Sequence, residues 1–314
     1  MSAPAEAGSR TLNPTATPLN RLLWFPKVGY SAQVAQIKCW GCIRGRNSSY
    51  SGQLGRSYAT VPGPVGLMPA DMGDNLPYLD IGVRSAVKLC AGATSTCALL
   101  DSGAVVCWGY PGFPAQGSGF MAIACGSKHM CAMQYAQDNG KAIIKCWGDN
   151  TYGQLGQGSS VLAYTGSLSD APAVDLGLGS YPYSLYLTCS GTSDGIDECQ
   201  GASSTSTGGG HCCVGIINEN TAWYNSSAKC WGSNSAGQLG YGDTLDRGTS
   251  PGHMGAYLPT ISLPFPASSS APYCPPNVDN APSDWMITKF AMGLSHTCMG
   301  AVCLRSHIAG YDVY

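Results

Sequence analysis

Cysteine is the residue type that gives this chain most of its capacity for chemistry. The chain carries 16 Cys among 314 residues, whereas Asp, Glu, Lys and Arg together make up only 11%. A cysteine content this high, outside a metal-finger array, indicates disulfide bonds, which persist in oxidising compartments. We therefore expect a covalently cross-linked protein located outside the cell or on its surface.

Other reactive arrangements in the sequence are weak. Cys39-x-x-Cys42 has the spacing of a redox or zinc motif, but no second ligand pair at a matching spacing accompanies it. His129, His211 and His296 fall at or near one position of a repeated pattern, and a repeated structural hydrogen bond explains them. No nucleophile elbow, phosphate loop or paired acid motif is present. The sequence thus predicts no enzyme activity, no catalytic residue, no metal and no cofactor.

A recurring motif indicates how the cysteines are positioned. Cys-Trp-Gly is followed by Gly-Gln-Leu-Gly in three copies that begin at Cys39, Cys146 and Cys230, and a fourth Cys-Trp-Gly begins at Cys107. A second element precedes the Trp motif and ends at Cys97, Cys131, Cys213 and Cys298. Because the elements recur in the same order, the chain is expected to be a repeat protein.

Each repeat has the pattern of a β-hairpin. Residues 97–100 and 104–108 are expected strands, and Gly103 between them supplies the positive φ that a tight turn needs. A single small sheet cannot bury both of its faces, so neighbouring sheets must stack on one another. Radial stacking predicts an all-β, propeller-like array of antiparallel sheets, with Trp and Leu filling the spaces between blades.

The same residues resemble the regulator of chromosome condensation repeats. The signature of that family runs Ala-Gly-x-x-His-Thr-Cys-Ala-Leu, a turn, and then Cys-Trp-Gly-x-Asn-x-x-Gly-Gln-Leu-Gly. The resemblance covers most of residues 34–303, with about four recognisable repeats. It implies a β-propeller. The founding member is a seven-bladed exchange factor for the small GTPase Ran, so the resemblance also implies guanine-nucleotide exchange as an alternative function.

The two ends of the repeat region are complementary. The first Trp motif, at Cys39, lacks an upstream half, and the last upstream half, ending at Cys298, lacks a downstream Cys-Trp-Gly. An N-terminal strand could therefore complete the last blade within one molecule, which would leave no open edge. Between molecules, the same pairing would be heterologous and could grow into a filament.

The repeat register predicts four disulfides, because cross-strand neighbours lie at a spacing compatible with disulfide geometry. The pairs are Cys97 with Cys107, Cys131 with Cys146, Cys213 with Cys230, and Cys39 with Cys298. A Ser- and Gly-rich insertion near 190–212 is expected to need a bridge from Cys199 to Cys212 or from Cys189 to Cys199. The sequence does not determine the connectivity of Cys42, Cys90, Cys125, Cys274 and Cys303.

Outside the repeats, residues 1–33 form a Pro-, Thr- and Ala-rich arm, and residues 34–314 are expected to form the repeat domain. The arm is either a disordered tail or a segment that docks on a neighbouring subunit. Its candidate anchor residues are Leu22, Trp24 and Phe25, and its candidate O-glycan acceptors are Thr11, Thr15 and Thr17. N-glycosylation sequons stand at Asn47 and Asn225.

Composition narrows the class of function. The formal net charge is −2, so no basic footprint for nucleic acid is present, and no apolar run approaches the ~20 residues of a membrane span. The sequence favours a non-enzymatic extracellular structural glycoprotein that assembles with itself head to tail into a scaffold or filament. A secreted propeller that binds another extracellular protein or a glycan is the alternative, and nucleotide exchange is opposed by the cysteine content.

Overall fold

The computed structural model consists of antiparallel β-sheets joined by loops and short 3-10 turns. It describes residues 37–41, 52–56, 64–82, 84–109, 117–135, 141–177, 180–190, 210–218, 227–261, 284–293 and 295–304. The chain divides into two units, Met1–Gln33 and Val34–Tyr314, and all of these described residues belong to the second. No helix in the described segments is long and apolar enough to cross a membrane.

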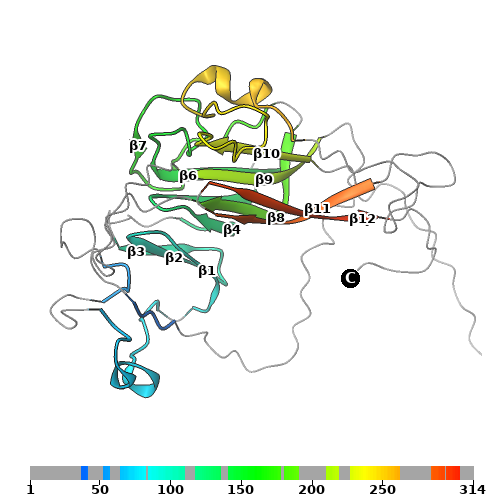
Figure 1. Ribbon diagram of the computed structural model, residues 1–314. Helices are drawn as coiled ribbons and strands as arrows, with labels where there is room; N and C mark the ends of the chain where they lie inside the picture. Colours follow the sequence, from blue (N-terminus) through cyan, green and yellow to red (C-terminus); the bar gives the residue numbers. More distant parts are fainter. Residues whose placement is uncertain are drawn as a thin grey trace, which may run out of the picture. The chain divides into compact units, whose positions relative to one another are not determined.

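Four sheets follow one another along the chain, as Figure 1 shows. The first contains β1 (Ala86–Ala91), β2 (Ser95–Leu100) and β3 (Val105–Gly109). The second contains β4 (Phe120–Cys125), β5 (His129–Tyr135), β6 (Ala142–Asp149) and β7 (Ala163–Tyr164). The third contains β8 (Ser180–Ser190), β9 (His211–Asn218) and β10 (Ser227–Gly232), and the fourth is a hairpin of β11 (Asp284–Met292) and β12 (Thr297–Leu304).

Short 3-10 turns lie in the segments that follow two of the Trp motifs. They are η3 (Pro69–Asp71), η4 (Gly73–Asn75), η5 (Pro251–His253) and η6 (Gly255–Tyr257). The tight turn between β2 and β3 depends on Gly103, whose φ of 77° lies in the region that favours glycine. The expected hairpin at this position is therefore present, with each strand boundary within two residues of the expected one.

The apolar core lies between successive sheets. Leu99 of β2 and Trp147 of β6 belong to one buried cluster, which joins the first sheet to the second. Ile144 of β6 and Trp231 of β10 belong to the next cluster, which joins the second sheet to the third. The sheets thus bury their faces against one another, and the fold is the expected all-β, propeller-like array of antiparallel sheets.

The ends of the array are packed on different sheets. Ile37 contacts Ala98 and Leu100 in a cluster with the β1–β3 sheet. Phe290 and Met292 of the hairpin pack on Cys213, Cys230 and Leu239 of the β8–β10 sheet and its following loop. Among the described residues, the 37–41 segment packs beside the first sheet and does not pair with β12, so it does not complete the last sheet as expected.

Candidate functional site

Cross-strand disulfides tie two neighbouring strands in each of the first three sheets. They join Cys97 to Cys107, Cys131 to Cys146 and Cys213 to Cys230, with Cα atoms 4.1, 4.0 and 4.1 Å apart. In every case the two residues lie directly opposite each other in the strand register. This close spacing is that of directly opposed residues without a hydrogen bond between them, where a disulfide fits.

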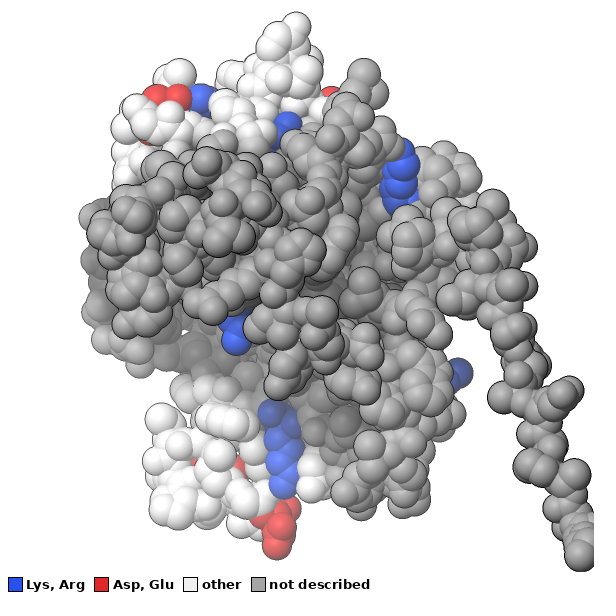
Figure 2. Space-filling view, turned by 90° about the vertical axis from the view of Figure 1, so that its right-hand side faces the viewer, with Lys and Arg blue, Asp and Glu red and all other residues white. Residues whose placement is uncertain are grey.

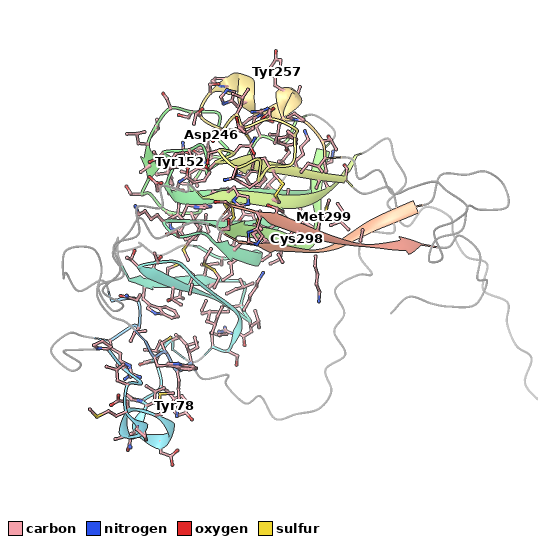
Figure 3. All side chains as sticks on the ribbon, viewed as in Figure 1. Tyr78, Tyr152, Asp246, Tyr257, Cys298 and Met299 are labelled. Carbon is pink, nitrogen blue, oxygen red and sulfur yellow. A yellow bond between two sulfur atoms is a disulfide. The ribbon has the colours of Figure 1, made fainter. Side chains whose placement is uncertain are left out.

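The expected fourth disulfide, from Cys39 to Cys298, is not formed in the structure. Cys39 and Cys298 are both free thiols, the first half-buried and the second exposed. Cys298 is labelled in Figure 3. The physical reason is the packing of the ends, since Cys39 lies in the cluster beside the β1–β3 sheet while β12 is paired with β11.

Two further disulfides have partners that repeat register did not predict. Cys189 of β8 is bonded to Cys212 of β9, so the expected bridges through Cys199 to either of these residues are wrong. Cys90 of β1 is bonded to Cys125 of β4, which links the first sheet to the second. Cys42, Cys199 and Cys274, and the side chain of Cys303, lie outside the described part of the structure.

Two of the motif tryptophans connect their sheet to the loop of a preceding repeat. Trp108 Nε1 donates a hydrogen bond of 2.9 Å to the backbone oxygen of Gln53. Trp231 Nε1 donates in the same way, at 3.0 Å, to Gln154. The Gly-Gln-Leu-Gly motif therefore provides an acceptor for the tryptophan of another repeat, which explains why the two motifs recur together.

The 37–41 segment has the position of a third strand. Gly41 pairs with Val65, as Gly148 of β6 pairs with Tyr164 and Gly232 of β10 pairs with Arg247. The outer edge of the segment is thus covered as it is in the β4–β7 and β8–β10 sheets.

A lysine contact shows the same correspondence. Lys38 precedes Cys39, as Lys145 and Lys229 precede the equivalent cysteines. The ammonium group of Lys38 donates to the carbonyl of Gly73 at 2.7 Å, and that of Lys229 donates to the carbonyl of Gly255 at 3.3 Å. Lys145 donates similarly to Ser169. These lysines were not predicted as positioning residues, although their place before Cys-Trp-Gly could have indicated it.

The β11–β12 hairpin has the position of the first two strands of a sheet. Thr297 Oγ1 donates a 2.9 Å hydrogen bond to the backbone oxygen of Gln238. Thr96 of β2 makes the same contact, also at 2.9 Å, with Gln53. In the described segments β12 pairs with β11 alone, so the hairpin lacks the third strand that β3, β6 and β10 provide in the other sheets.

The motif tryptophan of the 37–41 segment is far more exposed than those of the second and third sheets. Trp147 and Trp231 are 1% and 0% exposed, whereas Trp40 is 59% exposed. The 37–41 segment and the β11–β12 hairpin therefore carry complementary parts of one sheet: a third strand with its covered outer edge, and a first and second strand.

The repeat histidines are buried in two of the three copies. His211 contacts Ser190 Oγ through Nδ1 at 2.8 Å and Thr297 Oγ1 through Nε2 at 2.9 Å. His129 Nε2 lies 3.1 Å from Cys212 Sγ. The expected structural role fits these contacts, but the hydrogen bond is not the same from copy to copy.

Burial controls the protonation of these two histidines. It lowers the pKa of His129 to about 3, with a smaller contribution from the nearby His211. It lowers the pKa of His211 to about 4, with a smaller contribution from His296. Both imidazoles are therefore neutral at physiological pH.

His129, Cys189 and Cys212 bring three metal-ligating atoms together in the interior. Metal binding by cysteine requires a thiolate, and both of these cysteines are consumed by their mutual disulfide. In the oxidised state shown, this cluster offers a single imidazole as a metal ligand.

The remaining predicted residues lie outside the described part of the chain. They are the sequons at Asn47 and Asn225, the O-glycan candidates Thr11, Thr15 and Thr17, and the candidate anchor Leu22, Trp24 and Phe25. On the described part of the face in Figure 2, Lys and Arg side chains lie scattered.

Comparison with known proteins identifies the repeat type. Residues 86–113 match the Regulator of chromosome condensation (RCC1) repeat. Human WBSCR16 is 15% identical, with 80% of this chain and 52% of that chain covered and a TM-score of 0.45. Saccharomyces cerevisiae Prp20p, described with its binding properties to Gsp1p and histones, is 16% identical, with 68% and 44% covered and a TM-score of 0.35.

A plant ectodomain is also similar. The entire ectodomain of the Physcomitrella patens receptor kinase CR4 is 23% identical, with 54% of this chain and 36% of that chain covered and a TM-score of 0.31. The chain thus spans about half, or less, of the length of these solved structures.

Proposed function

We propose that this chain, in which residues 86–113 match an RCC1 repeat, is a non-enzymatic structural glycoprotein of the cell surface or extracellular space. Its copies join head to tail into a scaffold or filament. Five disulfides among the described residues support the compartment, since such bonds are rare in reducing compartments.

A single observation carries the proposal: each copy holds two complementary parts of one sheet. The 37–41 segment of one copy adds as a third strand to β12 of the next copy, and an antiparallel sheet like the other three results. Addition of a strand to an open edge is a common mode of protein association, because the edge presents unpaired backbone groups. The two surfaces differ, so the contact is heterologous and growth can continue.

Gln238 supplies the acceptor that positions Trp40 in this contact. Gln53 accepts hydrogen bonds from both Thr96 and Trp108. Gln238 accepts the equivalent bond from Thr297, and Trp40 of the next copy is the equivalent tryptophan. Burial of the Trp40 ring at the joint contributes on the order of 2 kcal/mol.

The test is the molar mass of the purified glycoprotein, measured by size exclusion with light scattering. The measurement covers a range of protein concentrations in a buffer without reductant. The wild-type chain is expected to form species whose mass increases with concentration. Trp40→Ala is expected to remain monomeric, because it removes the anchor of the joint. Tyr257→Ala is the control, since Tyr257 is also an exposed aromatic residue but lies away from the joint (Figure 3). A wild-type chain that is monomeric at every concentration would overturn the proposal.

A second function, binding of another extracellular protein, is favoured by exposed apolar residues on the loops. Val161 and Leu245 occupy the same repeat position and are 62% and 64% exposed. A repeated apolar position on the loops is suited to a protein partner, and Prp20p shows that proteins with these repeats bind other proteins. A monomeric chain that captures a partner through Val161 and Leu245 would favour this function over assembly.

A further inference from the structure

Cys39 and Cys298 occupy the two positions at which the complete sheets have a disulfide. We infer that Cys39 of one copy and Cys298 of the next form an intermolecular disulfide that locks each joint of the assembly. The inference rests on the proposed head-to-tail association and adds to it a covalent bond and control by redox conditions.

Contacts on the hairpin side place Cys298 where Cys97 lies in a complete sheet. Thr297 precedes Cys298 as Thr96 precedes Cys97. Both threonines donate to the backbone oxygen of the motif glutamine of the preceding repeat at 2.9 Å. The cysteine that follows is therefore held at the same place on its strand, and in the first sheet that cysteine is bonded to Cys107.

Contacts on the other side place Cys39 where Cys230 lies. Lys38 and Lys229 donate to equivalent carbonyl oxygens, of Gly73 and Gly255. The backbone NH of Leu79 donates to the oxygen of Ile37 at 2.8 Å, as that of Ile261 donates to Ala228, also at 2.8 Å. When the 37–41 segment pairs with β12 in the register of the other sheets, Cys39 and Cys298 lie opposite each other.

The bond joins two copies because, within one chain, the two cysteines are held at opposite ends of the array of sheets. Cys39 packs with the β1–β3 sheet, and the β11–β12 hairpin packs with the β8–β10 sheet. The β4–β7 sheet lies between these two, since it shares one buried cluster with each. A second copy brings the missing strand without any rearrangement of these cores.

Bond formation requires an oxidant, and oxidised glutathione is sufficient. The exposed Cys298 thiolate attacks one sulfur of oxidised glutathione, which releases one glutathione thiolate and leaves a mixed disulfide. Cys39 then loses its proton and displaces the second glutathione, so two electrons pass from the protein thiols to the oxidant. Burial raises the pKa of the Cys39 thiol, which makes this second step faster at higher pH.

The experiment uses wild-type chain, Cys39→Ser, Cys298→Ser and an equal mixture of the two variants, each incubated with oxidised glutathione. Products are separated without reductant, and bridged peptides are identified by mass spectrometry. The wild type is expected to give a ladder of covalent multimers. Neither variant alone is expected to form a bridge at this joint, and the mixture is expected to stop at dimers containing a Cys39 to Cys298 peptide.

The mixture decides between the possible links. A link within one molecule gives bridged wild-type monomers and no dimers in the mixture, and a link between two identical cysteines gives dimers in one variant alone. Either result overturns the inference. Because bridges are identified by their peptides, links through Cys42, Cys199, Cys274 or Cys303 are recognised as different.

Light scattering of the double variant Cys39→Ser/Cys298→Ser separates this inference from the proposed function. If the double variant still associates without covalent bonds, and the wild type forms no Cys39 to Cys298 bridge, the covalent lock is wrong and the assembly stands. If the wild type does not associate under any condition, the proposed function itself fails. Equal thermal unfolding temperatures of all variants are the control for intact folding.

Discussion

At the scale of single residues, the buried imidazole of His129 makes the fold sensitive to acid. Its pKa is lowered to about 3 in the folded chain, whereas an unfolded histidine has a pKa of about 6.5. Between these values the unfolded state binds more protons than the folded state. The stability that depends on the neutral imidazole is therefore fully present above pH 6.5, and the free energy of unfolding falls as the pH decreases below that value.

We expect this loss to amount to about 1.4 kcal/mol per pH unit for His129 between pH 6 and pH 4. His211, with a pKa of about 4, adds a similar slope over most of the same range. The measurement is urea unfolding at several pH values. His129→Asn should reduce the slope, because it removes the imidazole whose pKa burial lowers. Equal slopes in wild type and His129→Asn would contradict this account.

A glycine stands three residues before the repeat histidine in two repeats, and contact with the imidazole ring explains why. A Cβ atom at Gly126 would collide with the imidazole ring of His129, and one at Gly293 would collide with His296. The ring thus lies directly over the glycine backbone, a contact that no larger residue permits.

Gly126→Ala is therefore expected to destabilise the fold by about 1–3 kcal/mol, because the buried His129 cannot move away freely. Gly252→Ala is the matched control, since a Cβ there would meet no atom within 4 Å. Chemical denaturation of both variants gives the comparison. Similar stabilities for the two would show that the interior around His129 can relax.

At the scale of elements, the third strand of the β8–β10 sheet is held to its following loop by a buried lysine. Lys229 of β10 donates to the carbonyls of Leu176 and Gly255. Lys229→Met should leave these two oxygens without their donor and lower the free energy of unfolding by about 1–3 kcal/mol. Lys289→Met, at an exposed position of β11, should change it little. A stable Lys229→Met chain would indicate that water replaces the ammonium group.

The strands and central disulfides were predictable because they depend on local register. Cys97 and Cys107 flank a short turn containing Gly103, so the hairpin alone brings them opposite each other. Cys90 and Cys125 belong to different sheets, and their approach depends on how the sheets stack. Cys189 and Cys212 are brought together across the insertion by the pairing of β8 with β9, which the sequence pattern of the insertion does not indicate.

The candidate joint was only partly predictable for the same reason. The sequence showed that the motif at Cys39 lacks an upstream half and that the hairpin ending near Cys298 lacks a downstream half. It did not show on which sheet each half packs, because Ile37 meets Ala98 and Leu100 only through tertiary contacts. The choice between closure within the chain and contact between chains therefore required the structure.

At the scale of the whole molecule, the proposed assembly has a direction, because one end offers a strand and the other accepts it. A chain stopper should therefore exist. A peptide of residues 35–41 carries the donated strand, including Trp40, but has no hairpin to accept another copy. It should occupy β12 and end growth at each molecule that it binds.

We expect this peptide to reduce the mean molar mass of the assemblies in proportion to the fraction of hairpins that it occupies, as measured by light scattering. The same peptide with Trp40→Ala is the control, because it keeps the backbone that pairs with β12 but lacks the ring that donates to Gln238. A peptide containing Cys39 should also become bonded to Cys298 under oxidising conditions, which locates its binding site by mass spectrometry. If the peptide binds Cys298 but leaves the mass unchanged, copies associate through a surface other than this edge, and head-to-tail growth through the 37–41 segment is wrong.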